Sequence, residues 1–309
     1  MTQAGSGEIT VNIPSETDTL KTVVMCLPNP SSIISAIRYG GIDTALFYQA
    51  VYNKFNVFYN QEKVFEQQRK FIDVLKLNGV QVLLAEQIPN CSTQHYTRDV
   101  GFAIDDTFFC ANPRRNYRKR ELEGLKTLIP RFSKVARLES GVIEGGDVIV
   151  DEKNVIVGLG EETDKEGVDC LRRKLHETGI EREVITIEFS HRGIIHLDTK
   201  FNIPAKGIGM IHPKSFKPKS LRWLENNYDL IEATSDETNN IEINTFSISP
   251  RKVVMRERSN RLASLLESKG IEAILVDYSE VTKLPGSFRC TTLPIERAKN
   301  EPSKESGMA

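Results

Sequence analysis

One order of predicted elements recurs along most of this 309-residue sequence: two short strands joined by a turn, then a helix, then a closing strand. Each cycle takes roughly 50 residues, apart from a longer first one. Helices that alternate with strands place the chain in the α/β class. A doubly wound nucleotide-binding fold has one strand after each helix, and the sequence has neither G-x-G-x-x-G after a strand nor a P-loop. The recurrence therefore predicts five similar units.

Four of the cycles are regular. Hydrophobic periodicity separates their short strands from their helices. Their elements are predicted at Thr97–Asp105, Thr107–Ala111, Asn116–Leu128 and Val135–Glu139; at Gly146–Val150, Val155–Leu159, Lys165–Glu177 and Glu183–Phe189; at His196–Ile203, Gly207–Ile211, Ser215–Asn226 and Tyr228–Ala233; and at Ile241–Ile248, Lys252–Arg256, Arg258–Lys269 and Glu272–Asp277.

The first cycle is longer and less regular. Its elements are predicted as a strand at Thr22–Leu27, a helix at Glu62–Leu77 and a strand at Val80–Leu84. The stretch Ala36–Asn60 is rich in aromatic residues, and we interpret it either as a lid over a site or as packing beneath a loop.

No linker rich in Pro, Gly or Ser divides the sequence, so we expect a single domain at residues 21–297. Residues 1–20 are mostly polar and are predicted to be a disordered N-terminal segment. Residues 298–309 lack the apolar content to pack and are predicted to be a disordered tail.

The net charge is -1, from 41 basic and 42 acidic side chains. No whole-molecule field therefore favours nucleic acid or a membrane surface. The longest apolar stretches are far too short to span a bilayer, and the N-terminal residues do not resemble a secretory signal. We expect a cytoplasmic protein with no nucleic-acid or membrane partner. The basic run at residues 113–120 (PRRNYRKR) is interpreted as the start of a solvated helix or the lining of a loop.

The cysteine content argues against a disulfide scaffold. The five cysteines are an odd number, none stands in a C-x-x-C pair, and none has zinc-ligand spacing. We expect most of them to be small buried side chains. Cys290 is different in context because it follows a flexible Gly286-Ser287 bend.

Polar residues stand in four segments where the pattern alone would predict apolar ones. Each has a simple structural explanation on its own, such as a turn acid or a hairpin glycine. Together they supply a cysteine, a histidine and several carboxylates at strand starts, which converge on one axis in a closed cyclic arrangement. The segments are Tyr96–Val100 with Arg98 and Asp99, Ile143–Val150 with Glu144 and Asp147, Ile194–Thr199 with His196 and Asp198 on the same side of a strand, and Gly286–Thr292 with Cys290.

Such a set suits covalent attack on a cationic carbon. A thiolate is the reactive form of cysteine, and its pKa falls near positive charge, which a guanidinium substrate would supply. Two carboxylates can hold that guanidinium with charge-assisted hydrogen bonds. A histidine kept basic by a third carboxylate can protonate the leaving amine and then activate water.

The segments TRDVGF, EGGDVIV, HLDTKFNI and GSFRCTTLPIER resemble, in this order, motifs of the guanidino-group modifying enzymes. These are the arginine deiminases, dimethylarginine dimethylaminohydrolases and arginine amidinotransferases. The similarity runs from about Lys21 to Arg297. The resemblance implies the family's fold, a five-bladed α/β propeller (pentein) with pseudo-fivefold strand-strand-helix-strand repeats, which agrees with the recurrence.

The resemblance also implies roles for the site residues. Cys290 resembles the nucleophile that forms a covalent amidino-thioether, and His196 the general acid and base. Glu144 would be the partner of His196 or a substrate contact. The remaining assignments are Asp99 and Asp198 as the pair that holds the guanidinium, Arg98 as a support for Asp99 or a contact for a substrate carboxylate, and Asp147 with Gly145–Gly146 as residues that shape the site.

The branch of the family is less sharply indicated. Deiminases and amidinotransferases have an aspartate at the position of Asp198, and dimethylarginine hydrolases usually do not. The stretch HLDTKFNI resembles the amidinotransferase pattern, whereas the compact chain leaves little room for a transferase's additional elements. An ordinary deiminase has a helical insert and an arginine-rich loop before its cysteine, which here reads Thr282–Gly286.

Our first expectation is hydrolysis of the guanidino group of arginine or a close derivative, with a small-molecule substrate and no metal or organic cofactor. The alternatives are an amidinotransferase, an arginine dihydrolase that gives ornithine, and a catalytically silent pentein that acts as a binding factor. The complete set of reactive residues argues against the last. Oligomeric state stays open, a homo-oligomer included. The contact for a substrate carboxylate stays open as well, with Lys283, Arg289 and Arg98 as candidates.

Overall fold

The computed structural model describes residues 7–28, 60–89, 91 and 93–299. In this part of the chain fifteen strands form five separate three-stranded sheets. The aromatic stretch at residues 36–59, interpreted as a lid or as packing, and the predicted tail beyond residue 299 lie outside the described residues. The tail was predicted to start at Ala298, but Ala298 is the last residue of the strand β15 (Leu293–Ala298).

All five sheets have the same topology: the first strand is antiparallel to the middle one, and the third is parallel to it. Four sheets take their strands consecutively along the chain. They contain β3 (Gly101–Ile104), β4 (Thr107–Cys110) and β5 (Val135–Arg137); β6 (Val148–Asp151), β7 (Asn154–Leu159) and β8 (Glu183–Glu188); β9 (Phe201–Ala205), β10 (Ile208–Ile211) and β11 (Asp229–Glu232); and β12 (Phe246–Ser249), β13 (Lys252–Arg256) and β14 (Glu272–Val276).

The remaining sheet joins the two ends of the chain. The strand β15 (Leu293–Ala298) pairs with β1 (Thr19–Met25), which pairs with β2 (Gln81–Leu84). The first cycle therefore takes its first strand from the C-terminal region, which explains why only two strands were predicted for it. This pairing also places the cysteine segment directly before a first strand.

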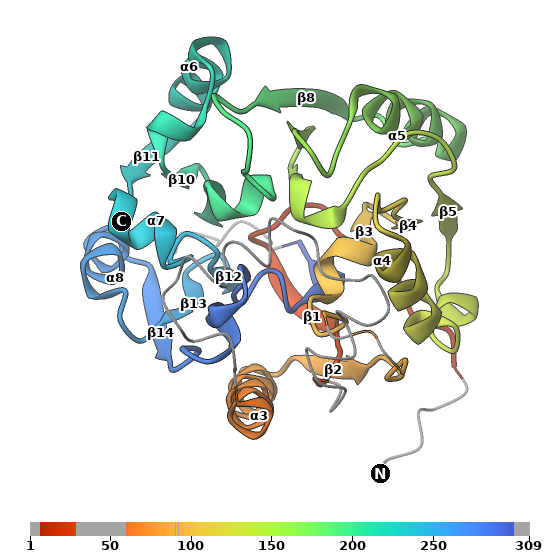
Figure 1. The fold of residues 1–309 in the computed structure, drawn as a ribbon, viewed down its shortest axis with the longest axis horizontal. Coiled ribbons are helices and arrows are strands. Elements are labelled where there is room, and N and C mark those ends of the chain that lie inside the picture. Colours follow the sequence, from red (N-terminus) through yellow and green to blue (C-terminus); the bar gives the residue numbers. More distant parts are fainter. Residues whose placement is uncertain (1–6, 29–59, 90, 92, 300–309) are drawn as a thin grey trace, which may run out of the picture.

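A helix connects the middle strand to the parallel third strand of each sheet, because a parallel pair needs a long crossover. Figure 1 shows α3, α5, α6 and α8 at the periphery, with the sheets around a central region. The peripheral helices bury apolar residues; in α5, for example, Val168, Leu171 and Leu175 are buried. The helices are α3 (Gln61–Leu77), α4 (Asn116–Glu121), α5 (Lys165–Thr178), α6 (Pro218–Asn227) and α8 (Asn260–Glu267), with a short α7 (Ser235–Asn239) outside this pattern.

The predicted α/β alternation is confirmed, but the first strand of each of the four regular cycles begins later than predicted; β12, predicted from Ile241, begins at Phe246. The 3-10 turns η1 (Thr97–Val100), η4 (Gly145–Asp147) and η5 (Leu197–Thr199) precede β3, β6 and β9. His196 and Asp198 are therefore not alternate residues of one strand. His196 stands at the start of η5, and Asp198 lies within it.

The prediction that residues 1–20 are disordered is wrong for the described part, residues 7–20. Ile9, Val11 and Ile13 alternate with outward residues and are buried, which is the pattern of a strand-like segment. Backbone bridges join Ile9 to Phe132 and Ile13 to Asp105. The polar composition of the segment concealed this alternation.

None of the described helices is long and apolar enough to cross a membrane. The strands and helices instead pack into clusters of buried apolar side chains within and between neighbouring sheets.

Candidate active site

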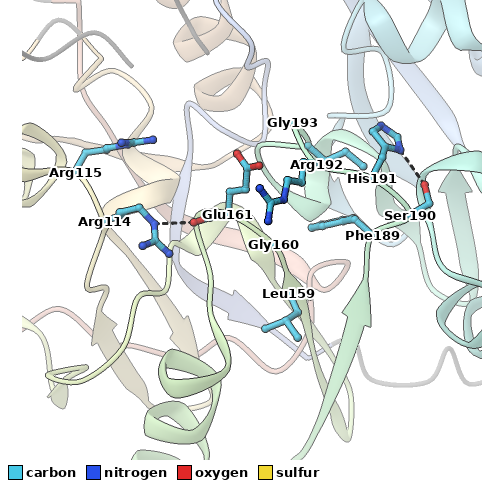
Figure 2. A pocket seen from close by; sticks show the side chains of 11 residues that line it. Arg114, Arg115, Leu159, Gly160, Glu161, Phe189, Ser190, His191, Arg192 and Gly193 are labelled. Atoms are coloured by element: carbon cyan, nitrogen blue, oxygen red, sulfur yellow. Dashed lines mark hydrogen bonds between the residues drawn. The ribbon is translucent and has the colours of Figure 1, made fainter. Parts of the chain in front are cut away.

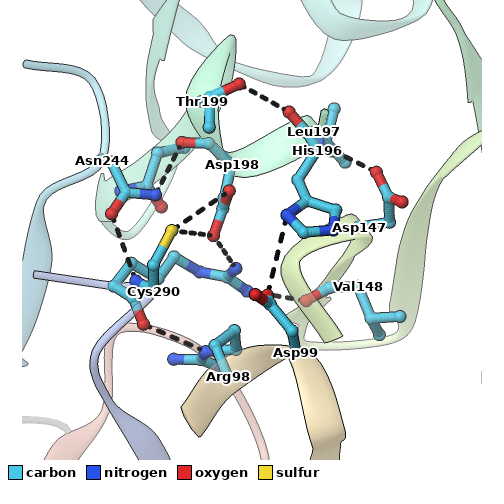
Figure 3. Close-up of polar contacts among 12 residues, drawn as sticks. Arg98, Asp99, Asp147, Val148, His196, Leu197, Asp198, Thr199, Asn244 and Cys290 are labelled. Atoms are coloured by element: carbon cyan, nitrogen blue, oxygen red, sulfur yellow. Dashed lines mark hydrogen bonds and ion pairs between the residues drawn. The ribbon is translucent and has the colours of Figure 1, made fainter. Parts of the chain in front are cut away.

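Five turns bring the candidate site together, one before the first strand of each sheet. These are η1, η4 and η5, with comparable turns at residues 241–245 before β12 and 287–292 before β15. The third strands lie at the periphery in Figure 1, so the turns face the centre. Figure 3 shows the side chains that these turns supply, all of them buried: Asp99, Asp147, His196, Asp198, Asn244 and Cys290.

His196 lies between two carboxylates, one at each ring nitrogen. Its Nε2 is 3.1 Å from Glu144 Oε2, and its Nδ1 is 3.6 Å from Asp99 Oδ1. Burial alone would lower the pKa of His196, but Asp99 and the hydrogen bond with Glu144 raise it well above the ordinary value. The resting imidazole is therefore a cation that can donate a proton.

The glycine turn permits this close approach. A Cβ atom on Gly146 would lie 2.5 Å from His196 Nδ1 and 2.9 Å from Asp99 Oδ1. A Cβ atom on Gly145 would lie 2.1 Å from the carbonyl oxygen of Arg98. Any larger residue would separate η4 from its neighbours, so the predicted shaping role of Gly145–Gly146 fits the geometry.

Asp147 is bonded to backbone and hydroxyl groups on both of its oxygens. Its Oδ1 accepts the backbone N–H of Leu197 at 2.9 Å, and its Oδ2 accepts the Thr163 hydroxyl at 2.6 Å. Burial raises the pKa of Asp147 to about 7. The bond to Leu197 ties η4 to η5, and this geometry fits the predicted shaping role of Asp147.

Cys290 lies in the turn before β15, where Asn244 fixes the backbone. Asn244 Oδ1 accepts the N–H groups of Ser287 and Cys290, both at 3.2 Å. The thiol sulfur is 3.7 Å from Asp198 Oδ2 and 3.9 Å from Asp198 Oδ1. Burial, and then the Asp198 and Asp99 carboxylates, raise the pKa of Cys290 well above its ordinary value. The thiol therefore keeps its proton unless a cation comes beside it.

Asp198 also binds an internal guanidinium. Arg289 Nη1 donates to Asp198 Oδ2 at 2.9 Å, and Arg289 Nη2 donates to Glu16 Oε1 at 2.9 Å. Arg289 is 1% exposed, and its Nη1 and Nη2 are both bonded within the site. Its role as the contact for a substrate carboxylate stays a prediction. Lys283, another candidate for that contact, is paired with Glu280 at 2.8 Å.

Arg98 supports the turn that carries the cysteine. Its backbone N–H donates to the carbonyl of Cys290 at 3.1 Å, and its Nε donates to the carbonyl of Arg289 at 3.4 Å. Its guanidinium is 3.7 Å from Glu16. Burial, with a smaller effect of Arg289, lowers the pKa of Arg98 to about 9. The partner of Asp99 is a different arginine.

That partner comes from the basic run, which was interpreted as solvated. Arg118 of α4 is buried; its Nη2 is 3.0 Å from Asp99 Oδ2, and its Nη1 is 3.2 Å from Glu121. The solvated interpretation is wrong for this residue, because the buried carboxylates of Asp99 and Glu121 require a buried cation. Lys119 and Arg120 are exposed, as expected.

Two other residues of the run border a surface cavity of about 620 Å³, shown in Figure 2. Arg114 and Arg115 lie on one side of this cavity, and Phe189 and Arg192 lie on the other. The lining ends at Ile194, two residues before His196.

Asp99, Glu144 and His196 each offer one ligand atom within 4.8 Å of the others, a spacing that a metal ion could use. The hydrogen bond and ion pair at the two nitrogens of His196 account for the same spacing. The expectation of a reaction without metal or organic cofactor stays a prediction.

The sequence reasoning missed three residues that the structure places in the site: Asn244, Arg118 and Glu16. Asn244 stands at the start of the fourth regular cycle, as Asp99 does in the first, so a comparison between cycles could have found it. Nothing in the sequence distinguishes Arg118 from its basic neighbours or Glu16 from other acids.

Five repeated α/β units, whose turns bring together a cysteine, a histidine and several carboxylates, define a guanidino-group modifying enzyme of the pentein superfamily. Residues 45–297 match the family described as N,N dimethylarginine dimethylhydrolase, eukaryotic, and the chain belongs to this family.

Sequence relatives agree with this placement. YkgA of Bacillus subtilis, described as uncharacterized, is 28% identical over 286 residues, which cover 92% of this chain and 95% of YkgA. An arginine deiminase of Streptococcus equi subsp. zooepidemicus is 29% identical over 196 residues, which cover 52% of this chain and 48% of the deiminase. The matched region therefore spans about half the length of that deiminase.

Two solved structures share the fold. SxtG, an amidinotransferase from Microseira wollei in saxitoxin biosynthesis, has a TM-score of 0.74 at 15% identity, covering 95% of this chain and 99% of SxtG. DDAH from Pseudomonas aeruginosa, in complex with citrulline, has a TM-score of 0.73 at 20% identity, covering 89% of this chain and 99% of that chain. At these identities the likeness is one of fold.

Proposed function

We propose that this protein hydrolyses the guanidino group of arginine, or of an N-methylated or related derivative, with Cys290 as a covalent nucleophile. The products would be a ureido compound, citrulline from arginine, and ammonia or an amine. We also propose that the five sheets are the blades of a five-bladed α/β propeller. The family match favours a hydrolase acting on arginine derivatives.

The observation that carries the proposal is that Asp99 and Asp198 each use only one carboxylate oxygen to bind an internal arginine. Each binds an internal arginine through Oδ2. The Oδ1 atom of Asp99 has no hydrogen bond and lies 3.6 Å from His196 Nδ1, whereas Oδ1 of Asp198 has the Cys290 thiol at 3.9 Å. These two oxygens are left for the N–H groups of a planar guanidinium between the thiol and the imidazole.

In the first half-reaction the substrate guanidinium places a positive charge beside the Cys290 thiol. This charge lowers the pKa of Cys290, so the thiol proton passes to solvent. The thiolate then attacks the central guanidinium carbon to form a C–S bond. His196 donates a proton to the departing nitrogen as the C–N bond breaks. An amidino-thioether on Cys290 and a neutral amine or ammonia result.

In the second half-reaction His196, now neutral, takes a proton from water. The hydroxide attacks the thioether carbon, the C–S bond breaks, and the thiolate leaves. The hydroxyl proton passes to the thiolate as the C=O bond forms, so Cys290 becomes a thiol again. The ureido product carries the oxygen of that water, and His196 keeps the proton that it took from the water. Glu144 holds the imidazole through Nε2 in both steps, which fits its predicted partnership with His196.

The second candidate is an amidinotransferase, in which an acceptor amine replaces water. It is favoured by Asp198, which stands two residues after His196 and belongs to the pattern that resembles transferases. A dihydrolase, which would release a second ammonia and ornithine, uses the same first step. The residues described do not distinguish these outcomes, but the products do.

The test is a product assay with arginine, methylated arginines, agmatine and guanidinoacetate, each with and without an acceptor amine. Mass spectrometry in H₂¹⁸O would detect one ¹⁸O in a ureido product if water is the acceptor. An amidino group on the added amine would identify a transferase, and ornithine a dihydrolase. No product from any of these substrates would contradict the proposed enzyme and favour a binding protein.

A further inference from the structure

We propose that Glu16, in the N-terminal segment, is a positioning residue for the nucleophile: it holds the Arg289 guanidinium against Asp198 and thereby fixes Asp198 beside Cys290. The inference rests on the proposed function, because it assigns Asp198 and Cys290 to that reaction. It gives a role to a segment that composition alone predicts to be disordered.

The contacts form one continuous chain. Glu16 Oε1 accepts from Arg289 Nη2 at 2.9 Å, Arg289 Nη1 donates to Asp198 Oδ2 at 2.9 Å, and that same Oδ2 lies 3.7 Å from the Cys290 sulfur. A further bond from Arg289 Nη2 to the carbonyl of Val148, at 2.6 Å, fixes the guanidinium plane. The rigid fork of an arginine then sets where each carboxylate lies.

The charges show why Glu16 is needed. Arg98 and Arg289 are both fully buried side chains, and Glu16 lies 3.7 Å from the first and 2.9 Å from the second. Burial tends to raise the pKa of Glu16, but the two arginines lower it to about 2, so it is ionised at neutral pH. Without it, Asp198 alone would face two buried guanidinium groups and would be drawn away from a substrate cation.

The same charges act on the thiol. The groups that face Cys290 are Asp198 from η5, Asp99 from η1, Arg289 from its own turn and Tyr278 from the segment after β14. The carboxylates raise the pKa of Cys290, and Arg289 lowers it. Without the charge of Glu16, the Arg289 cation is less neutralised and should lower the pKa of Cys290 further. Without Arg289 this lowering effect is lost, so the pKa of Cys290 should rise.

The experiment compares Glu16→Gln with Arg289→Gln, using Glu8→Gln as the matched control because Glu8 is exposed on the same segment. Two quantities are measured on folded protein: KM and kcat for the substrate found in the product assay, and the pH midpoint of Cys290 alkylation by iodoacetamide, read on the Cys290 peptide by mass spectrometry. Circular dichroism and thermal unfolding check that each variant is folded.

For Glu16→Gln we expect KM to rise about tenfold or more, with a smaller change in kcat, and the alkylation midpoint to fall by roughly half a unit or more. Arg289→Gln should raise the midpoint, and Glu8→Gln should change neither quantity. If Glu16→Gln does not fold, Glu16→Asp replaces it; it keeps the charge but shortens the reach, and should raise KM.

A folded Glu16→Gln variant with the wild-type KM and alkylation midpoint would overturn the inference. Alkylation midpoints that move in the same direction in Glu16→Gln and Arg289→Gln would also overturn it. Where Glu16→Asp is used instead, a wild-type KM in that variant would overturn it. Failure of the wild type to convert any guanidino substrate would contradict the proposed function only. The alkylation midpoints would still test the positioning of Cys290.

Discussion

Two aspartates illustrate how single residues divide their work in this site. Asp99 and Asp198 each give one oxygen to an internal arginine and keep the other near the reacting groups. The internal arginine fixes the position of each carboxylate. In the proposed reaction the remaining oxygen would meet the substrate.

Asp147 gives a prediction at this scale. Burial raises the pKa of Asp147 in the folded protein to about 7, above that in the unfolded chain, so the folded state binds the proton more tightly. The stability from this protonation is full below about pH 4 and is lost as pH rises toward 7. We expect the free energy of unfolding of the wild type to fall over this range relative to Asp147→Asn, measured by urea denaturation. A difference that stays constant with pH would contradict this assignment.

At the scale of elements, the turns before the first strands supply the residues of the candidate site. The alternation of helices and strands was predictable because apolar periodicity survives in every cycle. The 3-10 turns were not predictable from the sequence, because apolar residues have a similar pattern in a strand and in a turn that leads into a strand. The sequence therefore predicted which residues gather but not the turns that bring them together.

The helix α4 shows the same limit for a charged element. Its basic residues look alike in the sequence, yet only Arg118 points inward, where it meets Asp99 and Glu121. The sequence does not contain the tertiary contact that selects it. Asn244, in contrast, could have been predicted, because it stands at the start of its cycle as Asp99 does in the first regular cycle.

Arg118→Gln tests the role of α4. The substitution leaves the buried carboxyl groups of Asp99 and Glu121 without their paired cation, so we expect the free energy of unfolding to fall by about 3–5 kcal/mol. Any folded fraction should bind a guanidinium substrate more weakly, because Asp99 loses the partner that holds it. Thermal and urea unfolding measure the first effect and KM the second. Lys119→Gln, on the exposed side of α4, is the control and should change little. Equal small effects in both variants would contradict the buried role of Arg118.

At the scale of the whole molecule, the two ends of the described chain meet. The strand β15 completes the sheet of β1 and β2, and the segment before β1 crosses to other sheets through Ile9 and Ile13. These contacts link the centre, where Glu16 lies, to the periphery. Their long sequence separation is the reason that a local pattern could not predict them.

Ile13→Ala tests this arrangement. Ile13 is buried against the first core cluster, so the shortened side chain should reduce the free energy of unfolding by about 2–5 kcal/mol. Glu8→Ala, at an exposed position nearby, should lie within about 0.5 kcal/mol of wild type. Urea denaturation gives both values. If Ile13→Ala were as stable as Glu8→Ala, the segment would not pack as described.

The central claim is that Cys290 forms a covalent bond to the guanidinium carbon of the substrate. Acid quenching during turnover, followed by mass spectrometry of the Cys290 peptide, tests it most directly. We expect Cys290 of the wild type to carry the mass of the substrate less the departing ammonia or amine, and we expect neither adduct nor turnover in a folded Cys290→Ser variant. Turnover that persists in Cys290→Ser would contradict the account.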